Sequence, residues 1–187
     1  MTADFPEIRS LDQVLEEAEG LPAVTAGLVG AETPEAIEMA LHAEQTGLIE
    51  PVLVGRRHVI EPLMQAQGVS FPVIEASTPD AMARVAVEAV ESGQVRLLLK
   101  GHIHSDVFLR PIIRHLPHAP RVSHVFAAEM ASYHKLLFIT DAAINIAPDV
   151  QAKAEILQNA VNFTWWLGNK RARVAALSAT EMVNPAI

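Results

Sequence analysis

The stretch from residue 95 to residue 106 constrains the fold of this chain more than any other. Residues 95–99 are almost all branched aliphatic, which is typical of a strand covered on both faces in a parallel sheet. A lysine, a glycine, two histidines, a serine and an aspartate follow at positions 100–106. Open α/β sheets bind ligands just beyond the carboxyl ends of their strands. The stretch therefore predicts a buried parallel strand that ends at a ligand site.

Strand patterns and helix patterns alternate along most of the chain. We expect strands at 24–31, 49–55, 71–76, 95–99 and 173–177, and helices at 8–19, 34–47, 57–67, 79–92, 107–115 and 149–167. Thr33-Pro34 and Thr78-Pro79 both predict a threonine cap followed by a proline at the first helical position. Two further strands, at 121–126 and 136–140, are close enough in sequence to pair antiparallel. The alternation predicts an α/β fold with a mostly parallel, doubly wound sheet.

The helix expected at 149–167 begins at Asp149, whose side chain can cap it. Apolar residues at helical spacing predict its buried face, which we expect to contain Val150, Ala154, Leu157, Val161 and Trp165. Trp166 points about 100° away from Trp165, so we expect it at an interface or partly exposed. We treat residues 1–187 as one domain and expect a sub-boundary near residues 145–150.

Composition and charge exclude several classes of function. Lys and Arg number 14 against 22 Asp and Glu, a net charge of −8, whereas nucleic-acid binding needs clustered cations. The tight basic group Lys170, Arg171 and Arg173 is explained by a helix C-terminus. The chain has no cysteine, which rules out a cysteine nucleophile and suits the cytosol. No window resembles a membrane span or a signal peptide. We therefore expect a cytoplasmic protein without nucleic-acid or membrane partners.

His102 and His104 allow three interpretations of the polar stretch. Alternate residues of an extended segment point the same way, so both imidazoles could bind one metal ion. Against a metal, no third ligand follows at a matching spacing, and the neighbouring Lys100 ammonium would repel a divalent cation. The two histidines could instead serve only to hydrogen-bond the loop. The third interpretation is a polar pocket for an anionic ligand, and the neighbouring residues match it better.

The residue types around the histidines favour an anion. Lys100 supplies a point charge, and Gly101 lets backbone approach a ligand closely. Ser105 or Asp106 can cap a helix whose N-terminal amides attract phosphate. Arg110, one turn further on, could reach the same pocket with a bidentate fork or form a surface ion pair. We expect no bound metal.

Two later strand ends also carry polar groups. Asp141 and Asn145 could orient a substrate or only tie down their loop. Ser178 follows the last expected strand and could line the same edge or cap a following helix. The chain has no dinucleotide fingerprint, Walker A loop or nucleophile elbow. The residues alone predict an α/β protein that binds a small anionic ligand at 100–110 and 141–145.

Several segments spread along the chain carry a family resemblance. They lie at 47–55, 99–106, 110–111, 121–126, 139–148 and 177–185, and the run ITDAAINIAP at 139–148 is the most specific of them. In this order they resemble the phosphate acetyltransferase and phosphate butyryltransferase family. Within it they are more similar to the butyryltransferase-like branch, or to the phosphotransacetylase module found fused to hydratase-like domains, than to the classical acetyl enzyme. The resemblance covers nearly the whole chain.

The resemblance implies a fold, a reaction and a set of site residues. The fold would be three-layer α/β/α with a mostly parallel sheet, like that of isocitrate and isopropylmalate dehydrogenases, in a homodimer. The reaction would be reversible acyl transfer between acyl-CoA and inorganic phosphate, with coenzyme A and phosphate as substrates and no tightly bound cofactor. By position, catalytic roles fall to His104, Ser105 and Asp141, and substrate-binding roles to Lys100, Gly101, Arg110, Asn145 and Ser178.

The family continues past the Asn184-Pro185 pair near the end of this chain. Its Ser-Arg element with a following aspartate, to which phosphate binding and thiol deprotonation are attributed, belongs to that later part. We therefore expect a truncated domain that shows little acyl transfer by itself, acts with another polypeptide or is inactive. Two other functions stay open at this point. One is a metal-dependent hydrolase that uses His102 and His104, and the other is a non-catalytic acyl-CoA-binding module that uses Trp166 in a contact.

Overall fold

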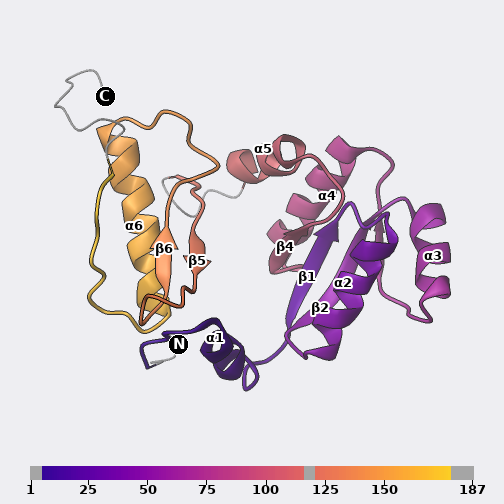
Figure 1. Ribbon diagram of the computed structural model, residues 1–187. Coiled ribbons are helices and arrows are strands. Elements are labelled where there is room, and N and C mark those ends of the chain that lie inside the picture. The colour runs from indigo at the N-terminus through magenta and orange to yellow at the C-terminus, as the bar shows by residue number, and fades with distance from the viewer. Residues whose placement is uncertain (1–5, 116–120, 178–187) are drawn as a thin grey trace. The chain divides into compact units, whose positions relative to one another are not determined.

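The computed structural model describes residues 6–115 and 121–177 of the chain (Figure 1). Its contacts divide the chain into two compact units. Ala18–His118 form one, which we call the sheet unit, and Met1–Glu17 with Ala119–Ile187 form the other, which we call the hairpin unit. The division falls between residues 118 and 119, and the sub-boundary expected near residues 145–150 stays a prediction.

The sheet unit contains four parallel strands in the order β3-β2-β1-β4. The strands are β1 (Val24–Val29), β2 (Ile49–Gly55), β3 (Val73–Glu75) and β4 (Leu97–Lys100), and the helices are α2 (Pro34–Gln45), α3 (Arg57–Ala66), α4 (Pro79–Glu91) and α5 (Ser105–His115). The chain steps from β1 through β2 to β3 in one direction. It then returns to place β4 on the other side of β1. The winding therefore reverses between β1 and β4, which is the switch point where open α/β sheets bind ligands.

Helices α2 and α4 begin in the way that their sequences predict. The side chain of Thr33 accepts a hydrogen bond from the Ala36 amide at 3.3 Å, and Thr78 accepts one from the Ala81 amide at 3.2 Å. A proline follows each threonine, and an acidic residue lies in each first turn. The hydroxyl satisfies an amide that has no partner within the helix, and the acidic residue favours the positive end of the helix dipole.

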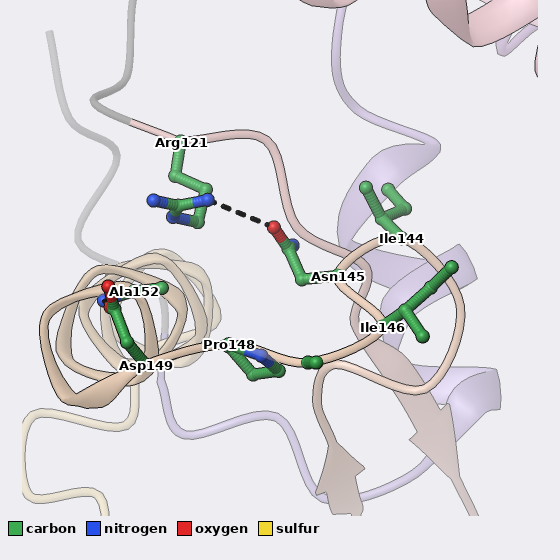
Figure 2. A pocket seen from close by; sticks show the side chains of 8 residues that line it. Arg121, Ile144, Asn145, Ile146, Pro148, Asp149 and Ala152 are labelled. Atoms are coloured by element: carbon green, nitrogen blue, oxygen red, sulfur yellow. Dashed lines mark hydrogen bonds between the residues drawn. The ribbon is translucent and has the colours of Figure 1, made fainter.

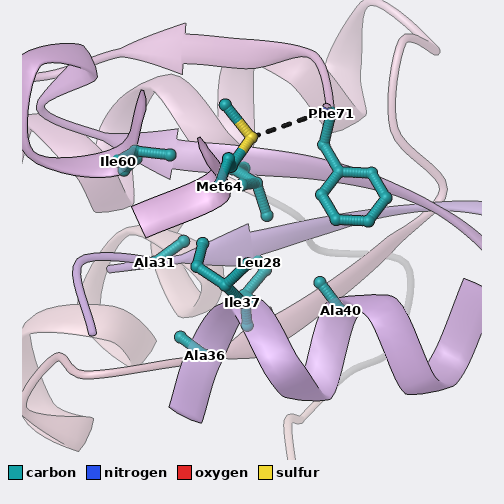
Figure 3. Packing of buried hydrophobic residues seen from close by; sticks show 9 residues of the cluster. Leu28, Ala31, Ala36, Ile37, Ala40, Ile60, Met64 and Phe71 are labelled. Carbon is teal, nitrogen blue, oxygen red and sulfur yellow. Dashed lines mark hydrogen bonds between the residues drawn. The ribbon is translucent and has the colours of Figure 1, made fainter. Parts of the chain in front are cut away.

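Helices cover both faces of this sheet, so the sheet unit has three layers. Successive residues of a strand point to opposite faces, which separates Leu28 and Leu53 from Val29 and Val54. The first pair packs under α2 and α3 (Figure 3), and the second pair packs under α4 and α5. The first cluster includes Leu28, Ile37, Leu53, Ile60 and Phe71, and the second includes Val29, Val54, Met82, Ala86 and Phe108. This confirms the predicted three-layer α/β/α class.

Strand β4 corrects one expectation. The apolar run at 95–99 predicts a strand covered on both faces, but β4 is an edge strand of the described sheet and Leu97 is 42% exposed. Val95, which is only 1% exposed, precedes the strand. The most buried strands are the central ones, β1 and β2, which have a neighbouring strand on each side and are buried from their third residue to their last. Hydrophobicity alone does not distinguish an edge strand from a central one.

The hairpin unit contains a two-stranded sheet and a long helix. Strands β5 (Phe126–Ala128) and β6 (Leu137–Ile139) pair antiparallel, as predicted, and α6 (Val150–Trp166) follows. The first strand was expected at 121–126, however, and β5 begins only at the last residue of that range. Most of α1 (Leu11–Ala18) belongs to this unit as well. The strand expected at 173–177 is wrong: these residues are not in a strand, and β5 and β6 are paired with each other rather than with this segment. In the described part of the chain, no helix is both long and apolar enough to cross a membrane.

Helix α6 also corrects the sequence analysis. Asp149 caps it as predicted, accepting a hydrogen bond from the Ala152 amide at 2.7 Å. Its buried face, however, consists of Ala152, Ile156, Ala160 and Thr164. The expected stripe of 150, 154, 157, 161 and 165 is wrong, because Val150 is 82% exposed and Trp165 is 43% exposed. The buried residues recur every four positions, and two of the four are alanines, which let the helix lie close to its neighbours. This outweighs the size of the apolar residues on the other face. Trp166 is 62% exposed, as expected.

The two threonine caps lead to a prediction about stability. Replacing Thr33 or Thr78 by alanine leaves a helix amide without its partner, so each change should lower the free energy of unfolding by about 1 kcal/mol. Urea denaturation followed by circular dichroism measures this. Ser70→Ala, at an exposed position outside any helix, is the matched control and should change stability by less than about 0.5 kcal/mol. Equal effects for all three variants would show that the caps contribute nothing.

Candidate functional site

The polar stretch 100–106 begins where β4 meets β1 at the switch point. Lys100 is the last residue of β4 and lies in register with Val29. The hydrogen bonding continues past the strand, because the Gly101 amide donates to the Val29 carbonyl and the His102 amide donates to the Gly30 carbonyl, both at 2.9 Å. The exit of β4 is therefore held on the exit of β1 by backbone alone.

Two glycines make this close approach possible. A Cβ atom on Gly101 would lie 2.8 Å from the Gly30 carbonyl oxygen and 3.0 Å from that of Val29. A Cβ atom on Gly30 would lie 2.9 Å from the His102 carbonyl oxygen. Gly30 also has a φ of +79°, a backbone conformation that L side chains rarely adopt. Glycine is thus required directly after β1 and directly after β4 for this loop to take its position.

Lys100 turns back over the loop that it begins. Its Nζ donates to the Ile103 carbonyl at 3.1 Å and approaches the Gly101 carbonyl at 3.5 Å. Ile103 is 8% exposed and anchors the loop in the core under α4 and α5. The positive charge therefore lies over the turn between β4 and the first turn of α5.

The imidazole of His104 and the hydroxyl of Ser105 are exposed at the start of α5. The His104 carbonyl accepts a hydrogen bond from the Phe108 amide at 3.0 Å, so the helix is already formed there. The first amides of a helix have no partner within the helix and favour negative charge. The Lys100 ammonium and the first amides of α5 are groups of the kind that an anion needs, and the anion site expected at 100–110 and 141–145 stays a prediction.

Arg110 forms surface ion pairs in this structure, which is the second of the two arrangements that the sequence allows. Its guanidinium lies 3.3 Å from the Asp106 carboxylate, and 3.7 Å from that of Asp80 at the start of α4. All three side chains are at least half exposed. Exposed ion pairs contribute only about 0–1 kcal/mol, so Arg110 can leave these carboxylates at little cost. Its contact with a bound anion stays a prediction.

Asp141 organises a loop in the hairpin unit. Its carboxylate accepts hydrogen bonds from the amides of His124 at 3.3 Å, Ala143 at 3.2 Å, Ile144 at 3.1 Å and Asn145 at 3.1 Å. The Asn145 side-chain amide donates to it too. Burial raises the pKa of Asp141, but the hydrogen bonds from Asn145 and from the loop amides outweigh it and hold the pKa below its ordinary value of 3.8. These hydrogen bonds favour a role for Asp141 in holding the loop in place over a role as a base.

Asn145 connects this loop to Arg121. The Arg121 guanidinium donates to the Asn145 amide oxygen at 3.2 Å (Figure 2). It also donates to the Glu155 carboxylate at 2.9 Å. The Asn145 amide nitrogen donates to the Val122 carbonyl at 3.0 Å. Arg121 and Asn145 border a pocket of about 370 Å³, which is lined by Arg121, Ile144, Asn145, Ile146, Ala147, Pro148, Asp149 and Ala152. Sequence reasoning did not select Arg121, although it begins one of the segments that carry the family resemblance.

The structure groups the predicted site residues into two sets, one in each unit. Lys100, Gly101, His104, Ser105 and Arg110 follow β4 in the sheet unit, and Asp141 and Asn145 share one loop of the hairpin unit. Ser178 lies outside the described residues. Within 6–115 and 121–177, no three His, Asp or Glu side chains are placed to hold a metal ion. A metal site at His102 and His104 thus gains no support from the geometry.

The comparison with known proteins identifies the family. A family model described as "Phosphate acetyl/butaryl transferase" matches residues 28–187. The chain belongs to this family. The match covers both the loop after β4 and the loop of Asp141, and it confirms the resemblance that the sequence motifs carry.

Individual relatives agree with this assignment. The phosphate acetyltransferase of Rickettsia typhi is 34% identical over 193 residues, which cover 99% of this chain and 55% of the relative. The probable phosphate butyryltransferase of Bacillus subtilis is 33% identical over 160 residues, which cover 77% of this chain and 54% of the relative. A branched-chain phosphotransacylase from Enterococcus faecalis matches in structure with a TM-score of 0.71, at 28% identity, over 88% of this chain and 59% of that chain. The chain spans about half the length of the curated relatives that it matches.

The glycine contact leads to a prediction. Gly101→Ala should lower the free energy of unfolding by about 1–3 kcal/mol, because the new Cβ meets backbone oxygens that cannot move aside. Gly20→Ala is the control, since no atom lies within 4 Å of a Cβ there. Chemical denaturation of both variants checks this. A Gly101→Ala protein as stable as the Gly20→Ala protein would mean that the strand exits are not in close contact.

The Asp141 hydrogen bonds lead to a pH-dependent prediction. Asp141→Asn should cost about 2 kcal/mol at pH 7, because hydrogen bonds to a charged acceptor are lost. The folded pKa is lowered, so this stabilisation is complete above the unfolded pKa and disappears as the pH falls through the folded pKa. The difference between wild type and variant should shrink below about pH 4. Urea denaturation at pH 7 and pH 3 tests this, with the exposed Glu91→Gln as control. A difference independent of pH would contradict it.

Proposed function

We propose that this chain acts in the reversible transfer of an acyl group between coenzyme A and inorganic phosphate. The single observation that carries the proposal is the family match over residues 28–187, which includes the whole polar loop after β4. The R. typhi and B. subtilis relatives are named as a phosphate acetyltransferase and a probable phosphate butyryltransferase. These names differ in the acyl group, so the proposal is limited to the acyl-CoA class.

The reaction makes defined demands on the site. A phosphate oxygen attacks the thioester carbonyl, and the carbonyl oxygen becomes an oxyanion. The bond from carbon to sulfur then breaks, and coenzyme A leaves as the thiol with the proton that phosphate gives up. Catalysis therefore needs cations for the phosphate and hydrogen-bond donors for the oxyanion. The loop after β4 offers the Lys100 ammonium, the exposed His104 and Ser105, and the first amides of α5.

We assign these residues the following roles. Lys100 and the start of α5 bind phosphate, Gly101 lets the backbone come close, and Arg110 joins when it leaves its exposed carboxylate partners. His104 and Ser105 donate to the oxyanion. In the hairpin unit, Asp141 is a positioning residue rather than a catalytic one, because it holds Asn145 through two hydrogen bonds. Ser178 keeps the substrate-binding role that the resemblance implies.

The homodimeric state and the cytoplasmic location that the resemblance and composition imply are part of the same proposal. Acyl-CoA and phosphate would be the partners, without a tightly bound cofactor. A non-catalytic acyl-CoA-binding module is the other outcome that the experiment below distinguishes. A metal-dependent hydrolase has no support from the ligand geometry of the described residues.

Ligand binding tests the proposal. Calorimetric titration should show saturable binding of acetyl-CoA or butyryl-CoA and of inorganic phosphate. Lys100→Gln should weaken phosphate binding about tenfold, because a charge-assisted hydrogen bond of about 1.5 kcal/mol is lost. Arg114→Gln, an exposed cation in the last turn of α5, is the matched control and should bind as wild type does.

Turnover then separates the two outcomes. Release of coenzyme A can be followed with a thiol reagent, and the protein adds no background because it has no cysteine. Phosphate-dependent release that Lys100→Gln reduces would support acyl transfer. Binding of the ester without release would indicate a binding module or a chain that transfers acyl groups only together with another polypeptide. A protein that binds neither the ester nor phosphate would contradict the proposal.

A further inference from the structure

A second group of cations lies in the hairpin unit and plays no part in the proposed reaction. Lys170, Arg171 and Arg173 follow α6, and Lys135 precedes β6. Together they line a pocket of about 620 Å³, whose other lining residues are Glu7, Gly168, Asn169 and Ala172. We call it the basic pocket. Four of the 14 basic residues of a chain with a net charge of −8 thus border one concavity.

The turn at the end of α6 brings these cations together. Gly168 has a φ of +82°, and the Asn169 amide donates to the Thr164 carbonyl at 3.0 Å while the Gly168 amide donates to Trp165 at 3.1 Å. This is a glycine-dependent turn that ends a helix. The Asn169 side-chain oxygen then accepts a hydrogen bond from the Arg171 amide at 3.1 Å, which fixes the start of the basic segment.

Compensation of the helix end does not account for this much charge. A helix C-terminus carries the equivalent of about half a negative charge, whereas four cations line the pocket. Glu7 is the one carboxylate among the lining residues, and it also pairs with Arg9 at 3.0 Å. The Lys170 ammonium is already engaged and lies 4.0 Å from the centre of the Trp165 ring, so we count the excess of charge on Lys135, Arg171 and Arg173 alone. The basic pocket therefore keeps an excess of positive charge.

We propose that the basic pocket binds an oligophosphate group, meaning two or more linked phosphates. Its volume falls within the range of about 300–1,000 Å³ that is typical of small-molecule sites. Arginine guanidinium groups match phosphate oxygens with paired donors, and lysine ammonium groups add point charges. A single phosphate would meet only part of a pocket that Lys135, Arg171 and Arg173 line, so a longer anion uses it better. The site shares no residue with the proposed acyl-transfer site and does not depend on that proposal.

Trp165 provides a reporter for the test. Trp166→Phe removes the other tryptophan at an exposed position, so the remaining fluorescence comes from the ring beneath Lys170. Titration with sodium pyrophosphate at constant ionic strength should change this fluorescence in a saturable way, since added salt alone screens exposed charges. Pyrophosphate should bind at least ten times more tightly than orthophosphate.

Variants locate the binding. In the Trp166→Phe background, Lys135→Gln combined with Arg173→Gln should weaken pyrophosphate binding at least tenfold. Lys153→Gln, an exposed cation on α6 outside the pocket, is the matched control and should change it less than twofold. Circular dichroism and the separate single variants show whether a loss reflects binding or folding, because each single change should weaken binding by itself.

The remaining outcomes decide the source of the ligand and the fate of the proposal. Competition by coenzyme A that is lost in the Lys135→Gln, Arg173→Gln variant would identify the diphosphate of a coenzyme as the ligand, whereas no competition would indicate a free oligophosphate. The inference is overturned if no saturable change occurs, or if that variant binds pyrophosphate as wild type does. If Lys100→Gln alone abolishes binding, pyrophosphate occupies the proposed phosphate site. The inference then fails while the acyl-transfer proposal stands.

Discussion

The close approach of two strand exits is the contact on which the candidate site of the sheet unit depends. Gly101 and His102 donate backbone hydrogen bonds to Val29 and Gly30, and neither glycine could carry a side chain at that distance. Backbone contacts of this kind cannot rotate to another arrangement, unlike a contact between side chains. The direction in which α5 leaves the sheet is therefore determined by β1, and with it the position of every polar group that follows β4.

Local patterns predicted most of the sheet unit. The bounds of β2 were correct from residue 49 to 55, and the threonine caps fixed the first turns of α2 and α4, because a cap depends only on residues within one turn. The errors concern properties that depend on distant neighbours. An edge strand and a central strand have similar composition, which explains the expectation for β4. In α6 the alanines at 152 and 160 are buried while larger apolar residues are exposed, and only the packing partners decide that.

In the candidate site, too, the features that depend on neighbouring residues in the sequence were predictable, whereas those that depend on distant contacts were not. The change from apolar to polar residues after β4 is visible in the sequence, and the switch point of the sheet explains why it falls there. For Asp141 the sequence left open whether it orients a substrate or ties down its loop, because three of its four backbone amide partners are local but the fourth belongs to the distant His124. Arg121 was missed because an isolated arginine gives no signal until the structure places it against Asn145 and Glu155.

The two loops that carry the predicted site residues are stabilised in different ways, and this bears on their chemistry. The loop after β4 is held by backbone atoms, so its charged and polar side chains, Lys100 apart, are not needed to maintain it. The loop of Asp141 is held by a carboxylate, whose charge is satisfied by five donors. A group that stabilises its own loop must give up those hydrogen bonds before it can react, which costs about 1–3 kcal/mol for each one left unsatisfied. The reacting groups are therefore better sought after β4, and the Asp141 loop serves to present Asn145 and its neighbours in one fixed arrangement.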